Sequence, residues 1–207
     1  FTDANQKLGT QMKATGEVMS IGRTFEESLL KAVRSLEIGV FHLFMQKFES
    51  MGEDELMQYI KIGTDDRIYA IARLLRLGVS VDKICEQTKI DRFFIDKMVN
   101  IINEEKALIA AKGDAAELKK AKKAGFSDKE IARLWDMSEL EVYNLRKQHS
   151  VFPVYKMIDT CASEFESYVP YFYSTYEDEN ESVVSNRRKV IVLGSGPIRI
   201  GQGVEFD

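Results

Sequence analysis

Cysteine is scarce in this sequence: only Cys85 and Cys161 are present, and they lie far apart in the 207 residues. No apolar stretch of the kind found in a secretory signal is present either. Both absences favour a reducing compartment, so we expect the two thiols to be small buried side chains rather than a disulfide. The cytoplasm is the location that these features predict.

Long hydrophobic runs are absent too. No apolar run approaches the roughly 20 residues that cross a bilayer, which argues against a membrane protein. The first residue is Phe1 rather than Met, and the residues after it show no targeting pattern. We therefore expect this end of the chain not to be a natural start.

Histidines and reactive thiols in a catalytic arrangement are missing. His42 and His149 stand alone, with no other ligand at metal-binding spacing, and we assign them no role because isolated histidines are usually satisfied structural residues. Cys161 follows Asp159 closely. No histidine is near, however, and the segment is predicted to be a strand, so a buried structural thiol is preferred to a nucleophile.

Two pairs of neighbouring carboxylates, Glu26/Glu27 and Asp65/Asp66, are present. Both pairs are predicted to lie in first helical turns, where the helix dipole favours negative charge. They therefore need no catalytic explanation. We predict no catalytic, cofactor-binding or metal-binding residue in this chain.

What the sequence does contain predicts a mainly α fold. It is 44% apolar and 30% charged with a net charge of −4, enough for one compact domain plus parts of others. The pairs Thr24/Glu27, Ser127/Glu130 and Ser138/Glu141 match capping boxes, which begin helices. Helices are predicted from Thr24 to a stop at Gly39, over 53–60, over 115–123, and after the two later boxes. Most of 64–103 is also predicted to be helical. In that stretch Gly78 is a break, Ser80 is a cap and Asp91 begins a longer helix. Residues 155–176 are predicted to be extended and 177–186 a polar linker.

An internal repeat lies within the helical part. Gly78, Ser80 and Ile84, followed by Ile90 and Ile95, match Gly125, Ser127 and Ile131, followed by Met137 and Val142, each at an offset of 47 residues. We expect two related helical hairpins in one compact domain, because a solenoid needs about three copies to bury a continuous face.

The segment from Gly125 to Arg146 also resembles the helix-turn-helix of a DNA-binding protein. The second helix of such a motif faces DNA with its start, which here is Ser138-Glu139-Leu140-Glu141. Two carboxylates at that position oppose the phosphates, so a packed hairpin is preferred and no nucleic-acid partner is expected.

The C-terminal residues predict the start of an α/β domain. Val190 to Leu193 has the composition of a buried parallel strand, and Gly194, Gly196, Gly201 and Gly203 follow it. The loop is neither a dinucleotide fingerprint, because Arg199 takes the third glycine position, nor a phosphate loop ending in Gly-Lys-Ser/Thr. We expect this strand and loop to be loosely packed or poorly ordered here, since the crossover helix and partner strands do not follow.

Three longer segments carry a resemblance. Residues 8–28, from Leu-Gly-Thr-Gln-Met-Lys to Thr-Phe-Glu-Glu-Ser, resemble the end of the first synthetase half of the carbamoyl phosphate synthase large chain. Residues 154–165 with 171–176 are similar to the segment leading into the second half of that chain. Residues 192–207 are similar to the opening of the second half.

The resemblance implies a division of the chain. Residues 1–23 would be the tail of the first ATP-grasp half, which makes carboxyphosphate, and 24–152 a helical oligomerisation domain. Residues 153–188 would be an extended connector, and 189–207 the first strand and glycine loop of the second half, which phosphorylates carbamate. The truncated α/β segments would thus flank the helical domain.

The resemblance also implies an activity for the whole protein. That enzyme is a ligase that makes carbamoyl phosphate from bicarbonate, two ATP and ammonia for arginine and pyrimidine synthesis. It uses magnesium or manganese, and a glutaminase small chain supplies the ammonia from glutamine. The nucleotide and metal residues of the family have no counterpart in this chain, so the chain itself is expected to hold no cofactor and to be inactive.

Self-association is the activity expected of the chain itself. Phe41 to Phe44, with Met45 and Phe48, forms an apolar cluster in a stretch with few charges. If part of it is exposed, it forms a patch of the kind that pairs across a two-fold axis. The alternative is that these side chains close the core over the helix that begins at Thr24.

Overall fold

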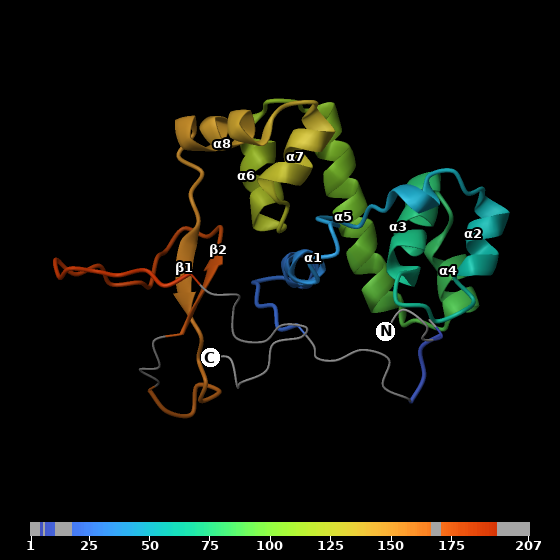
Figure 1. Ribbon diagram of the computed structural model, residues 1–207, viewed down its shortest axis with the longest axis horizontal. Helices are drawn as coiled ribbons and strands as arrows, with labels where there is room; N and C mark the ends of the chain where they lie inside the picture. The colour runs from blue at the N-terminus through green and yellow to red at the C-terminus, as the bar shows by residue number, and fades with distance from the viewer. Residues whose placement is uncertain (1–4, 6, 11–17, 167–170, 194–207) are drawn as a thin grey trace.

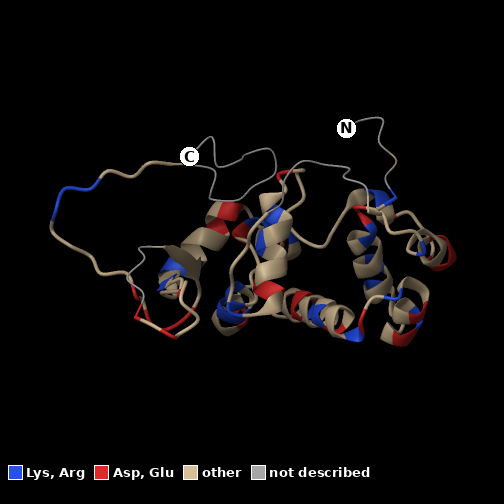
Figure 2. Ribbon diagram, turned by 90° about the horizontal axis from the view of Figure 1, so that it is seen from below, with Lys and Arg blue, Asp and Glu red and all other residues tan. Residues whose placement is uncertain are grey.

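The computed structural model describes residues 5, 7–10, 18–166 and 171–193. These are mainly helical with one small antiparallel sheet, as predicted (Figure 1). Over the helices taken together, Lys and Arg are interspersed with Asp and Glu (Figure 2). The elements are α1 (Phe25–Ser35), the 3-10 turn η1 (Gln46–Phe48), α2 (Glu53–Tyr59), α3 (Arg67–Leu77), α4 (Val81–Thr88), α5 (Arg92–Ala110), α6 (Ala115–Lys123), α7 (Asp128–Trp135), α8 (Glu139–Gln148), β1 (Val154–Met157) and β2 (Phe172–Thr175).

The predicted helix starts are present, but only one of the three boxes is reciprocal. Ser138 accepts from the Glu141 backbone N–H while the Glu141 carboxylate accepts from the Ser138 backbone N–H. Thr24 and Ser127 make only the first of these two bonds. The Glu27 carboxylate accepts from the Arg23 N–H at 2.6 Å instead. The carboxylate three residues after the N-cap therefore accepts from whichever donor the tertiary fold brings closest.

Two predicted details of the helix ends were wrong. Helix α1 ends at Ser35, well before Gly39, because Glu37 adopts the left-handed conformation (φ 52°) that terminates it. Asp65 and Asp66 precede α3 instead of lying in its first turn. Asp66 accepts hydrogen bonds from Tyr59 and Thr64 and pairs with Lys47, so it ties α2 and η1 to the start of α3. Glu26 and Glu27 do lie in the first turn of α1.

The repeat is larger than the two predicted hairpins. Gly78 and Gly125 take φ values of +90° and +94°, and each is followed by a backbone bond that closes the same left-handed helix end, Val79 N–H to Leu74 O and Phe126 N–H to Ala121 O. Because those carbonyls belong to α3 and α6, each copy is a three-helix unit: α3–α4–α5 and α6–α7–α8. Figure 1 shows α5, the long last helix of the first unit, lying between α3 and the helices α6 and α7 of the second unit.

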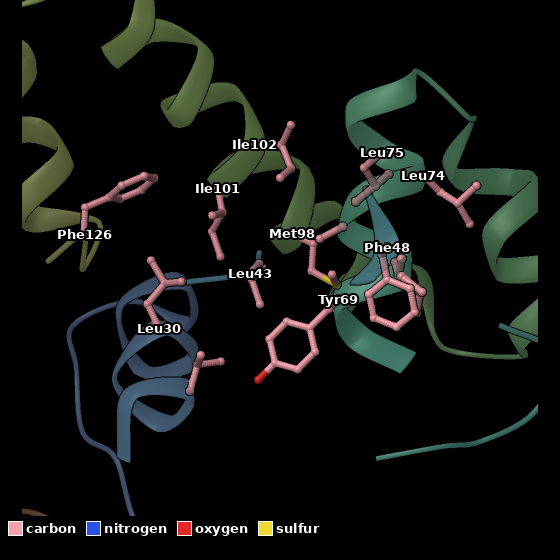
Figure 3. Close-up of a cluster of buried hydrophobic side chains, with 14 of the residues drawn as sticks. Leu30, Leu43, Phe48, Tyr69, Leu74, Leu75, Met98, Ile101, Ile102 and Phe126 are labelled. Carbon is pink, nitrogen blue, oxygen red and sulfur yellow. The ribbon is translucent and has the colours of Figure 1, made fainter. Parts of the chain in front are cut away.

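One contiguous core joins α1 to both units (Figure 3). Leu30 of α1, Leu43 of the following loop and Ile101 of α5 are fully buried, and Phe126 closes the core beside α1. The Trp135 indole N–H donates to the Leu108 carbonyl at 2.6 Å, which fixes the end of α7 against α5. The loop after α1 contacts α7 through Phe41 and Phe44, whose rings lie under Lys129 and Arg133.

The segment after α8 forms a small hairpin in place of a continuous extended chain. β1 pairs antiparallel with β2, from Val154 opposite Thr175 to Met157 opposite Phe172. Between them, the Asp159 carboxylate accepts from the backbone N–H groups of Cys161 and Ser163, which makes a turn. Cys161 is therefore part of a turn and half-buried, and the predicted strand and buried thiol there were wrong. Cys85 is also half-buried rather than buried.

The C-terminal apolar run is exposed. Val190 and Leu193 are 90% and 91% accessible, and residues 190–193 pair with no strand. The predicted glycine loop, 194–203, lies outside the described residues.

Candidate self-association surface

The apolar cluster after α1 divides between core and surface. His42, Leu43 and Phe48 are buried, which agrees with the hypothesis that the cluster closes the core. Phe41 is 36% exposed and Phe44 is half-buried, which agrees with the alternative of a surface patch. Each interpretation therefore holds for part of the cluster.

Phe41 and Phe44 lie in a depression of about 470 Å³. We call it the aromatic depression. One wall is the loop 39–44, and the others come from α7 and the start of α8. Its lining also includes Lys129, Glu130, Ala132, Arg133, Met137 and Glu139.

Both aromatic rings are covered by cations from α7. The Lys129 ammonium lies 3.7 Å from the centre of the Phe41 ring, and the Arg133 guanidinium 4.4 Å from that of Phe44. Arg133 is held by two bonds to the Glu130 carboxylate, at 2.7 and 3.0 Å, and this contact raises its pKa. The depression thus has an apolar centre under a rim of fixed charge.

His42 forms the floor of the aromatic depression. It is 1% exposed, and neither ring nitrogen has a hydrogen-bond partner among the described residues. Its Nε2 lies 3.7 Å from a Glu105 oxygen and 4.0 Å from a Glu130 oxygen, beyond hydrogen-bond distance. The expectation of a satisfied structural histidine was therefore wrong in this respect.

Glu105 stays ionised beneath that floor. Burial alone would raise the pKa of its carboxyl group, but the contacts with His42 and Arg76 outweigh burial and lower the pKa to about 2. Arg76 donates to both carboxylate oxygens, at 2.8 to 3.1 Å. Contacts with the buried Glu105 carboxylate thereby join α5 to α3 and to the loop that follows α1.

The residues of α7 and α8 were not predicted to belong to this surface. Lys129 and Arg133 are one helical turn apart on α7, and Glu139 begins α8. Sequence reasoning considered them only as parts of a DNA-binding motif. Their spacing places Lys129 and Arg133 on one face of a helix, but the depression forms only because the loop after α1 folds back onto that face.

The nucleic-acid hypothesis gains nothing from the geometry. The start of α8 presents Glu139 and Glu141, with Leu140 66% exposed between them. In Figure 2, Lys and Arg are interspersed with Asp and Glu among the coloured helices. A DNA-binding surface needs Lys and Arg gathered on one face.

A second polar cluster joins the hairpin to the helices. Asp128 is paired with Lys122 at 2.8 Å and with Arg146 at 2.7 Å, and Arg146 also donates to the Val151 carbonyl. Burial lowers the pKa of Lys122 to about 8. Both cations lie over the Tyr176 ring, at 5.0 and 5.7 Å. We call Lys122, Asp128 and Arg146 the buried ion triad.

The buried ion triad has no counterpart in the first unit. At the offset of 47 residues, the three equivalent positions are Leu75, Val81 and Val99, all apolar. The charges are therefore not required to build the three-helix unit. The three charges occur in the second unit, the unit on which the hairpin packs.

The described residues form neither a metal cluster nor a membrane-spanning helix. Among residues 5, 7–10, 18–166 and 171–193, no group of three His, Cys, Asp or Glu is placed to hold a metal ion. In the same residues, no helix is long and apolar enough to span a bilayer.

The fold is a helical domain built from two related units, with the aromatic depression on its surface. The family model of the carbamoyl-phosphate synthetase large chain, oligomerisation domain, matches residues 17–150. Since the match covers well over half of the sequence, the chain belongs to this family. The resemblance to this large chain is thereby confirmed for the oligomerisation domain, over residues 17–150. Carbamoyl-phosphate synthetase large chains are ATP-dependent ligases.

Proposed function

We propose that this chain is the self-associating centre of a carbamoyl phosphate synthase large chain. Residues 24–152 form the helical oligomerisation domain. Residues 1–23 belong to the end of the carboxyphosphate half, 153–188 to a connector, and 189–207 to the start of the carbamoyl phosphate half. The observation that carries the proposal is the aromatic depression, since a family named for oligomerisation needs a surface of this kind.

The parent enzyme supplies the context for this role. It makes carbamoyl phosphate in the cytoplasm from bicarbonate, two ATP and ammonia delivered from glutamine by a glutaminase small chain, with magnesium or manganese. The helical domain holds copies of the large chain together and takes no part in the chemistry.

Self-association is tested by light scattering after gel filtration across a range of protein concentrations. The wild-type chain should rise from monomer towards dimer mass. Phe44→Asp should remain monomeric, because a carboxylate in the aromatic depression must be desolvated on association. Phe165→Asp is the matched control, since Phe165 is 75% exposed and lies outside the depression. A wild-type chain that stays monomeric throughout defeats the proposal.

A further inference from the structure

Two opposite charges at the aromatic depression have no ion-pair partner. Lys129 lies over the Phe41 ring, and neither Lys129 nor Glu139 makes a salt bridge with any residue that the structure describes. The charged neighbours Asp128, Glu130 and Arg133 are all paired. Lys129 and Glu139 are thus charges of opposite sign on two different helices, both lining one depression.

This arrangement fits a second copy of the chain. In a two-fold dimer each surface meets itself, so residue i of one copy faces residue j of the other and the reverse contact forms automatically. A rim with charges of one sign would repel its copy, whereas a rim with one cation and one anion can pair with its copy twice.

The other exposed aromatic cluster lacks this property. Phe25, Phe93 and Phe94 contact one another beside an apolar pocket of about 230 Å³. The cations next to them, Arg92 and Lys97, already pair with Asp82, Asp96 and Glu26 within the chain. Asp65 and Arg67, which also line that pocket, make no salt bridge with a described residue, but they lie two residues apart at the start of α3 and so supply no opposite charges on two different helices.

Resting on the proposed self-association, we propose that two copies meet at the aromatic depression around a two-fold axis. Phe41 and Phe44 of both copies form the apolar centre. Lys129 of each copy pairs with Glu139 of the other. Such pairs at the edge of an apolar contact fix register and orientation, and they make association weaken as salt increases.

Charge reversal tests the pairing directly. Lys129→Glu alone places two carboxylates opposite each other at both symmetric contacts, and Glu139→Lys alone does the same with two ammonium groups. Each single variant should therefore weaken the dimer by about 10-fold or more in Kd, measured by sedimentation equilibrium. The double variant restores opposite charges and should return Kd to within about 3-fold of wild type.

Mixing the two single variants gives the sharpest result. A heterodimer of Lys129→Glu with Glu139→Lys has opposite charges at both contacts, so it should form more tightly than either variant pairs with itself. The matched controls are Lys83→Glu and Glu86→Lys on α4, the equivalent helix of the first unit, where both side chains are exposed. These should leave Kd unchanged. Circular dichroism and Tm establish that each variant is folded.

The outcomes separate the two proposals. A wild-type chain that never self-associates overturns both. A wild-type dimer whose Kd is unaffected by the single reversals, or a mixture that fails to form the heterodimer, overturns the Lys129–Glu139 pairing and leaves self-association standing.

Discussion

Glu105 is a residue whose environment determines its charge. It is 6% exposed and would favour the neutral form if it were alone, yet Arg76 and His42 keep it ionised and lower its pKa to about 2. A carboxyl group of lowered pKa contributes stability above its unfolded pKa of 4.5, and that contribution is lost as the pH falls towards 2.

We therefore predict that acid destabilises the fold through Glu105. Urea unfolding of the wild-type chain should lose about 3 kcal/mol through this group between pH 5 and pH 2. Glu105→Gln should already be less stable at pH 7, because the Arg76 guanidinium is left without its carboxylate. The free energy of unfolding of this variant should then fall less steeply as the pH is lowered. Equal slopes for the two proteins would show that folding does not lower the pKa of Glu105.

Gly125 and Gly78 offer a matched pair at the same place in the two units. Both have left-handed φ angles, but a Cβ on Gly125 would lie 2.8 Å from the Glu27 Cα, whereas nothing lies within 4 Å of one on Gly78. Gly78→Ala should cost about 1 kcal/mol for the left-handed backbone alone. Gly125→Ala should cost roughly 2–4 kcal/mol, since α1 must also move away. Chemical denaturation measures both, and equal losses would mean that α1 does not approach Gly125 so closely.

At the scale of helices and strands, the sequence predicted the features that depend only on residues close together in the chain. Ser80, Ser127 and Ser138 begin helices because a hydroxyl bonds the free N–H groups of a first turn, and this chemistry needs no tertiary partner. The repeat could be predicted for the same reason. The turn at Asp159 was missed because the aromatic residues around it favour strands, while its carboxylate offers the backbone a local alternative.

The buried polar contacts and the surface depression could not be predicted in this way. The helix 115–123 is rich in alanine and lysine, and nothing in its sequence marks Lys122 as buried. The aromatic depression was predicted in part, from Phe41 and Phe44, but its rim comes from α7 and α8. Which of these aromatic side chains enter the core depends on how α7 packs, so a pattern over one segment could not decide it.

The buried ion triad yields a prediction about the hairpin. Replacing Lys122, Asp128 and Arg146 by the first unit's leucine, valine and valine should leave the helical domain folded and as stable as wild type, or up to about 4 kcal/mol more stable. The hairpin should loosen, because Tyr176 loses both cations and the Val151 carbonyl loses its donor. Trypsin cleavage after Lys156, which is 9% exposed, should then be faster.

The single variant Asp128→Val serves as the control for the triad. It leaves two buried cations without their anion and should cost about 3–5 kcal/mol. Unchanged cleavage after Lys156 in the triple variant would show that other contacts, such as the Lys31 bond to the Ser174 carbonyl, hold the hairpin by themselves.

For the whole molecule, the proposed role separates assembly from catalysis. We predict that the isolated chain neither hydrolyses ATP nor makes carbamoyl phosphate in the presence of bicarbonate, ammonia and magnesium. A steady-state ATPase assay measures this. Turnover above background that persists after repurification would contradict it.

Hydrogen exchange at protein concentrations below and above the onset of association tests the central claim most directly, because it reports both whether copies meet and where. Protection should rise with concentration in residues 39–44 and 128–139, the two segments that form the aromatic depression. It should stay constant in α2 and α4. Protection that is independent of concentration, or that rises only around Phe25, Phe93 and Phe94, would contradict self-association at this surface.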